Sequence, residues 1–285
     1  MNYDNQYRPS GFGFLPLVTK NILIINVILF LATELLKYSK GIDLNDYLGL
    51  HYYSAGNFKP HQFVTYIFMH GSFQHILFNM FGVYIFGQVL EQVWGPKKYL
   101  IFYLITGFGA AIAQYIVISF SIAPIIDSIQ AVQNNLNPGT LEALLNKAEF
   151  QNTISFNFFP TYNDFVQKYN MALVEKSPRA MALASQFLID YKNQYLNSQV
   201  IIGASGSLFG LLGAFGMLFP NRYLYLYFFF PIKAKWLVTA YGAIELFSGL
   251  QNSPEDNVAH FAHLGGLFVG IILVLFWRKD RQQFY

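Results

Sequence analysis

The stretch Gly203-Ala204-Ser205-Gly206 opens one strongly apolar segment of the chain, and His260-Phe261-Ala262-His263-Leu264-Gly265-Gly266 opens another. Polar side chains are costly in hydrocarbon, so those found inside apolar segments usually have a function. A hydroxyl and an imidazole are also the usual nucleophile and base of a hydrolytic site. The two stretches therefore suggest hydrolysis at membrane depth.

The composition supports a membrane protein. The chain has 285 residues, of which 54% are hydrophobic and only 12% are charged, and that is too apolar for an ordinary soluble domain of this size. It contains no cysteine, which excludes disulfides, thiolate catalysis and cysteine-ligated metal sites. The net charge of +3 gives no reason to expect binding to nucleic acid. No metal or organic cofactor is implied.

Six apolar segments approach the length of about 20 residues that a membrane-crossing helix needs. The fourth and fifth are the shortest. The predicted spans are residues 21–36, 75–93, 99–120, 203–219, 236–250 and 258–277. The aromatic run at 223–230 is too short to span and is predicted to lie at the interface.

Basic residues gather in the short loops at one end of these spans. Cytoplasmic loops carry an excess of Lys and Arg, so this pattern places both termini in the cytoplasm. The loop with Glu255 and Asp256 has no basic residue and is predicted to lie outside. We expect an integral protein of a bacterial plasma (inner) membrane. The basic residues concerned are Arg8, Lys20, Lys97, Lys98, Arg222, Lys233, Lys235, Arg278, Lys279 and Arg281.

The predicted fold class is all-α, a six-helix membrane bundle with an insertion. Residues 140–150 and 177–196 of the long loop between the third and fourth spans are predicted to be helical. The insertion is either a spacer or a part that handles substrates or partners. The predicted parts are a cytoplasmic segment at 1–20, helices one to three at 21–120, an extracytoplasmic helical insertion at 121–200, helices four to six at 201–277, and a cytoplasmic tail at 278–285.

Four polar side chains are expected in one layer near the outer face. With the N-terminus inside, the second, fourth and sixth helices all begin outside. At 1.5 Å per residue, Ser205 and His263 then lie within roughly 10 Å of the outer boundary. His75 and Asn79 are four residues apart, so they share one face at the start of the second helix. Water can reach this layer from outside.

Small residues indicate that the fourth and sixth helices pack closely. Small residues let membrane helices approach, and a serine–histidine hydrogen bond needs such an approach. His263, Gly266 and Gly270 stand at i, i+3 and i+7, so the histidine lies on the same face as these glycines. The glycines of the fourth helix are Gly203, Gly206, Gly210 and Gly213.

Taken together, these motifs resemble those of the rhomboid family of intramembrane serine proteases. Gly203-Ala204-Ser205-Gly206 matches its nucleophile motif, and Ala262-His263-Leu264-Gly265-Gly266-Leu267-Phe268-Val269-Gly270 matches its histidine motif. His75-Ile76-Leu77-Phe78-Asn79, preceded by His70, matches a third motif, and 91–95 resembles the end of the family's second helix. All four occur in the family's order.

The resemblance implies a role for each residue. Ser205 attacks the scissile carbonyl, and His263 serves as base and then as acid. The backbone N–H of Ser205, with His75 and Asn79, stabilises the oxyanion. His70 and Glu91 are interpreted as structural. His260 is assigned to the outer interface, with an assisting role left open, and because no carboxylate lies near this layer in sequence, a Ser–His dyad without an acid is expected.

By the same resemblance, the expected activity is that of a serine endopeptidase acting on single-span membrane proteins near the outer face. Its partners are then transmembrane protein substrates and membrane lipid, and the fifth helix forms a lateral gate for substrate entry. Two other functions are considered as alternatives to this protease. An inactive rhomboid-like protein would bind membrane clients without cutting them, and a transporter would carry polar groups along the whole depth of a span.

Overall fold

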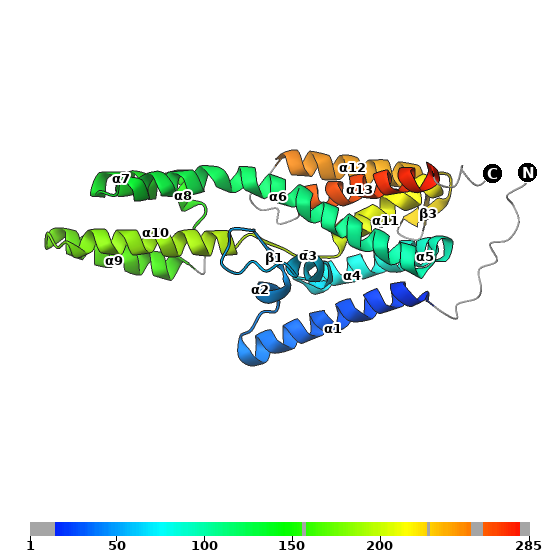
Figure 1. The fold of residues 1–285 in the computed structure, drawn as a ribbon, viewed down its shortest axis with the longest axis horizontal. Helices are drawn as coiled ribbons and strands as arrows, with labels where there is room; N and C mark the ends of the chain where they lie inside the picture. Colours follow the sequence, from blue (N-terminus) through cyan, green and yellow to red (C-terminus); the bar gives the residue numbers. More distant parts are fainter. Residues whose placement is uncertain (1–14, 156–157, 227–228, 252–258, 280–285) are drawn as a thin grey trace, which may run out of the picture.

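The computed structural model describes residues 15–155, 158–226, 229–251 and 259–279 and is almost entirely helical (Figure 1). The membrane bundle comprises the helices α1 (Leu17–Lys40), α4 (Phe73–Gly82), η2 (Val83–Gly87), α5 (Gln88–Trp94), α6 (Pro96–Asn134), α11 (Ser205–Leu218), α12 (Ala234–Gln251) and α13 (His260–Lys279). The segment η2 is a π-helical stretch that joins α4 and α5 into one continuous span.

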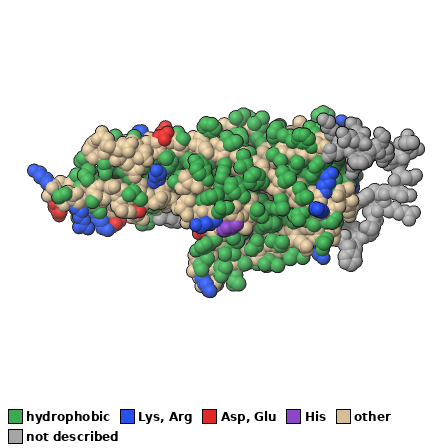
Figure 2. All heavy atoms as spheres, in the orientation of Figure 1, with side chains coloured by type: hydrophobic (Ala, Val, Ile, Leu, Met, Phe, Trp, Pro, Cys, Tyr) green, Lys and Arg blue, Asp and Glu red, His purple; other side chains and the backbone are tan. Residues whose placement is uncertain are grey.

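Four of these helices are long and apolar enough to cross a membrane, namely Leu17–Lys40, Phe73–Trp94, Pro96–Asn134 and His260–Trp277, and Ser205–Leu218 is a shorter apolar helix. Hydrophobic side chains cover the bundle in Figure 2, whereas most acidic side chains in this view lie on the insertion and basic side chains occur there and at the edges of the bundle. The predicted all-α membrane bundle is confirmed. The predicted acidic loop with Glu255 and Asp256 lies outside the described residues, as do residues 1–14.

The insertion consists of the helices α7 (Pro138–Leu145), α8 (Ala148–Gln151), α9 (Phe159–Val174) and α10 (Arg179–Asn197). Its core is aromatic, and the Phe165 and Phe187 rings stack at 4.0 Å between centroids. The helix α9 was not predicted, although Tyr162, Phe165, Tyr169 and Ala172 recur at helical spacing and the last three are buried. The predicted third span ends at 120, whereas α6 continues to Asn134 because Ile122, Ile125 and Ile129 carry a buried stripe onward.

Two small sheets complete the fold. The loop after α1 holds α2 (Asn45–Leu48), β1 (Leu50–His51), α3 (Gln62–Thr65) and η1 (Tyr66–Phe68), and β1 pairs antiparallel with β2 (Val200–Ile201) just before α11. The aromatic run at 223–230 contributes to a hairpin of β3 (Tyr223–Leu226) and β4 (Phe230–Lys233) between α11 and α12. In Figure 1 this hairpin lies at the end of the bundle away from the insertion, and α4, α11 and α13 begin at the opposite end.

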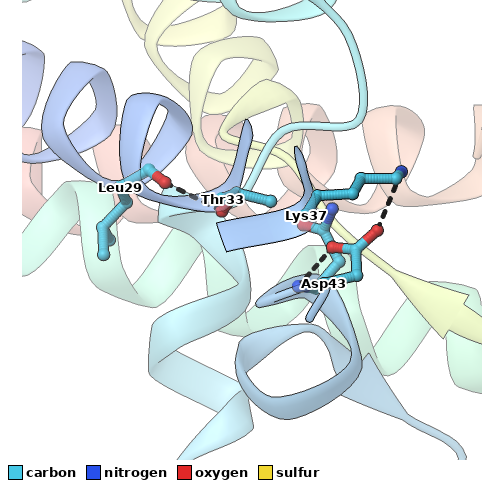
Figure 3. A network of polar contacts seen from close by, with 5 residues as sticks. Leu29, Thr33, Lys37 and Asp43 are labelled. Atoms are coloured by element: carbon cyan, nitrogen blue, oxygen red, sulfur yellow. Dashed lines mark hydrogen bonds and ion pairs between the residues drawn. The ribbon is translucent and has the colours of Figure 1, made fainter. Parts of the chain in front are cut away.

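The C-terminal end of α1 is closed by local contacts (Figure 3). Thr33 Oγ1 donates to the Leu29 carbonyl at 2.8 Å, which satisfies the hydroxyl inside the helix. Gly41 then adopts a left-handed conformation with φ 67°, the usual helix stop. Lys37 Nζ lies 3.1 Å from Asp43 Oδ2, an exposed ion pair that contributes little to stability.

The opposite end of α1 is capped by a carboxylate from another helix. Glu91 on α5 is buried, and its oxygens accept hydrogen bonds from the Val18 N–H at 2.9 Å and from the Thr19 N–H and Oγ1 at 2.7 Å each. The first N–H groups of a helix have no partner within it, and they favour negative charge. Glu91 therefore joins α1 to α5 and has the structural role expected from the sequence.

Replacing Glu91 by alanine is expected to destabilise the bundle by about 3 kcal/mol, because buried donors lose a charged acceptor. Thermal unfolding in detergent micelles measures the change. Glu34→Ala, which alters an exposed carboxylate on α1, is the control and should leave the midpoint nearly unchanged. Equal midpoints for the two variants would contradict the capping role.

Candidate active site

The backbone before Ser205 is fixed on both sides. Strand β2 is paired with β1, and the Gly203 N–H then donates to the Tyr66 carbonyl at 3.0 Å. Gly203 has φ +122°, a conformation that side-chain-bearing residues rarely adopt, and a Cβ there would lie 2.8 Å from the His75 ring. These contacts place Ser205 at the first position of α11.

Two serines lie close together at this helix start, and their surroundings differ. Ser205 lines a groove, whereas Ser207 is fully buried and its Oγ donates to the Tyr103 carbonyl of α6 at 2.8 Å. That bond holds Ser207 away from the groove. Of the two, Ser205 is the hydroxyl that a substrate can reach.

His263 faces Ser205 across the contact between α13 and α11. Its Nε2 lies 2.8 Å from Ser205 Oγ. The His263 ring stacks on Phe209 with centroids 4.4 Å apart and an interplanar angle of 6°. The stacking fixes the plane of the imidazole, so one nitrogen points toward Ser205 and the other points toward α12.

A carboxylate lies on the far side of His263, and the expectation that none would approach is wrong. Glu245 of α12 places Oε2 at 2.9 Å from His263 Nδ1 and at 2.6 Å from His260 Nδ1. The bond to His260 is well directed, whereas the Nδ1–H of His263 is poorly aligned with the oxygen despite the short distance. His260 is therefore part of this cluster rather than only an interfacial residue.

His75 and Asn79 of α4 line the same groove as Ser205. The His75 ring packs against the backbone at Gly203, two residues before Ser205, and contacts the His70 ring at 4.8 Å between centroids. Asn79 is buried one turn further along α4. Both residues line the groove with Ser205 and His263. The four predicted site residues are thus brought to one place.

His70 lies beneath this site. It is 1% exposed, and neither ring nitrogen has a hydrogen-bond partner within the described residues. Burial lowers the pKa of His70 to about 3, so the ring is neutral at physiological pH. It packs against His75 as an aromatic support and does not line the groove.

The groove itself is large and opens along the bundle. It has a volume of ≈ 2020 Å³ and runs between α4, α11 and α12, with further walls from α6 and from the end of the insertion. Gln114 and Ser121 of α6 and Gln199 after α10 contribute polar groups to it. The site is therefore accessible to a long segment as well as to water.

The comparison with protein families agrees with this geometry. The family model described as Rhomboid domain matches residues 57–124 and 167–280. The chain belongs to the rhomboid family. The unmatched residues 125–166 comprise the end of α6, the helices α7 and α8, and the first half of α9. This rhomboid therefore carries helices that the family model does not contain.

Two curated relatives are similar over short segments. Rhomboid-like protein 11, chloroplastic, from Arabidopsis thaliana is 32% identical over 87 residues, which is 27% of this chain and 31% of the relative. RHOMBOID-like protein 6, mitochondrial, from the same plant is 38% identical over 60 residues, 21% of this chain and 20% of the relative. In both cases the match spans less than a third of the relative's length.

Glu245 is the residue of this rhomboid site that the sequence reading missed. A signal was present, because Glu245 is the only acidic residue within the predicted fifth span, 236–250. Intramembrane carboxylates are functional candidates by default. Only the packing of α12 against α13 could show which residues it meets.

Gly266→Ala is expected to destabilise the protein, although a Gly→Ala change inside a helix usually stabilises it by up to about 1 kcal/mol. The reason is that a Cβ at Gly266 would lie 1.9 Å from the Gly206 carbonyl oxygen, so α11 and α13 would have to separate. Thermal unfolding in micelles provides the measurement. Gly139→Ala, where the nearest atom is at 3.4 Å, is the control, and a Gly266 variant as stable as this control would contradict the contact.

Proposed function

We propose that this rhomboid-family protein is a serine endopeptidase that cleaves single-span membrane proteins within the bilayer, near its outer face. The observation that carries the proposal is the 2.8 Å contact between Ser205 Oγ and His263 Nε2, beside a groove large enough for a peptide segment. A serine and histidine at this distance are the minimal nucleophile and base of acyl transfer.

In the proposed reaction, Ser205 Oγ attacks the scissile carbonyl carbon while His263 Nε2 accepts its proton. The resulting imidazolium then donates that proton to the leaving amine, and an acyl-enzyme remains. Water from the groove attacks the acyl group, again with His263 as base, and releases Ser205. The original Ser205 proton thus leaves with the amine product, and a proton from water restores the Ser205 hydroxyl, so the enzyme is regenerated.

Glu245 supports His263 in the role of a positioning residue. A carboxylate beside Nδ1 favours the tautomer with its proton on Nδ1, and this leaves the Nε2 lone pair directed at Ser205. The poor alignment of the His263 contact is compatible with this role, since catalytic hydrogen bonds are often loose without substrate. The proposal thus replaces the expected dyad by a serine–histidine pair with an acidic support.

The oxyanion of the tetrahedral intermediate is proposed to form at the start of α11. The Ser205 N–H is one of the unpaired donors at a helix N-terminus, where negative charge is favoured. His75 and Asn79 supply side-chain donors from the opposite wall of the groove. One such donor typically contributes about 10²- to 10³-fold in rate.

The proposed substrates are single-span membrane proteins, and the position of the groove within the membrane bundle supports this choice. A membrane helix has its amides paired internally, so it must unwind locally before cleavage, which weak helix formers such as Gly and Ser make easier.

The proposed location is a bacterial plasma membrane with both termini in the cytoplasm. Its support is a set of basic residues in the first turns of α1, α6 and α12 and at the hairpin of β3 and β4, namely Lys20, Lys97, Lys98, Arg222, Lys233 and Lys235. These ends of the elements lie away from the insertion in Figure 1.

A serine-directed fluorophosphonate probe should label the native protein in micelles, and Ser205→Ala should lose the label. His263→Ala should reduce labelling by at least about 10³-fold, because Ser205 then has no base. Ser207→Ala, which removes the buried neighbouring hydroxyl, should keep most of the label and is the matched control.

Equal labelling of native protein and Ser205→Ala would refute the assignment of the nucleophile. Cleavage of a single-span model substrate that persists in both Ser205→Ala and His263→Ala would refute the mechanism. Specific capture of the model substrate without labelling or cleavage would instead point to the client-binding alternative.

Glu245→Gln should lower kcat by about 10- to 10²-fold with a smaller effect on KM, because the amide no longer favours the productive tautomer of His263. Cleavage of the model substrate across pH 5 to 9 measures both constants, and the acidic limb of the profile should move in the variant. The exposed Glu34→Gln is the control. A change in folding yield alone, with an unaltered pH profile, would reduce Glu245 to a structural role.

A further inference from the structure

Three side chains able to bind a metal ion cluster on the side of His263 that faces away from Ser205, and His263 is one of them. Glu245 comes from α12, and His260 and His263 come from the first turn of α13. Their ligand atoms all lie within 4.8 Å of one another. They are largely buried, with side-chain exposures of 11% for Glu245, 13% for His260 and 11% for His263.

The donor set selects one class of ion. Two imidazole nitrogens and one carboxylate oxygen suit zinc and related transition metals, whereas magnesium and calcium prefer oxygen ligands. Zinc bonds of about 2.0 to 2.2 Å in tetrahedral geometry place ligand atoms roughly 3.3 Å apart. The two contacts of Glu245 Oε2, at 2.6 and 2.9 Å, are shorter than this, whereas the ligand atoms as a set lie up to 4.8 Å apart. Ion binding therefore requires the carboxylate to withdraw and the widest pair of ligand atoms to move closer together.

We propose that Glu245, His260 and His263 form an inhibitory binding site for a divalent ion of the zinc class. Binding of the ion does not depend on the proposed function, whereas the inhibition rests on it. The ion would leave a fourth coordination position for water, as three-ligand zinc sites do.

The ion is expected to inhibit because it would coordinate Nδ1 of His263 and thereby fix the proton of the ring on Nε2. His263 Nδ1 faces Glu245 and Nε2 faces Ser205, and stacking on Phe209 holds the ring in this orientation. An ion bound to Nδ1 uses that lone pair, so the single proton of the neutral imidazole must sit on Nε2. A protonated Nε2 cannot accept the Ser205 proton. The ion therefore blocks the base without touching the nucleophile or the groove.

Metal binding is tested on full-length Ser205→Ala protein in micelles, prepared without a polyhistidine tag. Zn²⁺ is titrated in competition with a fluorescent zinc chelator. One ion per chain is expected, and His260→Ala and Glu245→Gln, each in the Ser205→Ala background, should weaken binding at least tenfold. His61→Ala in the same background, which removes an exposed histidine of the loop before α4, should not change it.

Size-exclusion chromatography first establishes that each variant is folded. If His260→Ala does not fold, the nearly isosteric Glu245→Gln provides the test of the site. Zinc affinity that is the same in the parent and in every folded variant of the cluster would overturn the site.

Inhibition is tested with Ser205 intact, by the rate of fluorophosphonate labelling. Zn²⁺ should slow labelling, a chelator should restore it, and Mg²⁺ should have no effect. In His260→Ala the half-inhibiting concentration should rise at least tenfold, with each protein compared with its own metal-free rate. Zinc that binds without slowing labelling would overturn the inhibitory role. A metal-free protein that is never labelled would refute the proposed function instead, and the titration would still decide the metal site.

Discussion

The approach of α11 to its two neighbours is the constraint on which the rest of the structure depends. At Gly206 and Gly210 the backbone of α11 meets the backbone of α13 at Gly266 and Gly270, with no room for a Cβ on α13. On the other side, α6 fills the space that side chains at Gly206 and Gly210 would need. In lipid, where burial of apolar surface gives little drive, such close packing stabilises helix contacts. Since Ser205 precedes Gly206, this packing also sets its distance from His263.

Much of the bundle and most of the site were predictable, because their signals are local in sequence. Apolar length revealed the spans, glycine spacing indicated which helices touch, and the motifs around Ser205 and His263 pointed to the family. The contact between Glu245 and His263 could not be predicted, because it depends on how α12 rotates about its axis against α13. The extension of α6 past 120 likewise depends on packing, because Ile122, Ile125 and Ile129 are buried where α6 contacts the insertion.

Two buried carboxylates of the described residues, Glu91 and Glu245, lie inside helices of the membrane bundle, and the structure accommodates them differently. Glu91 receives three hydrogen bonds and is fully used in joining α5 to the start of α1. Glu245 shares a single oxygen between two histidines, one of them poorly aligned. A buried charge is expensive unless its partners are well arranged. Glu91 therefore stabilises the contact between α1 and α5. Glu245 is held less firmly, so its carboxylate can shift between His260 and His263.

The continuity of α6 has a consequence for the size of protein that can approach the groove. Residues 121–134 extend the helix by about 20 Å at 1.5 Å per residue and hold the insertion near the groove mouth. Under the proposed function, a client whose folded domain directly followed its membrane helix would meet α7–α10 at this height. A client with an extended linker of about six residues, at roughly 3.3 Å each, would clear the same height. For the proposed protease, the insertion would therefore select clients by the length of this linker, independently of the chemistry at Ser205.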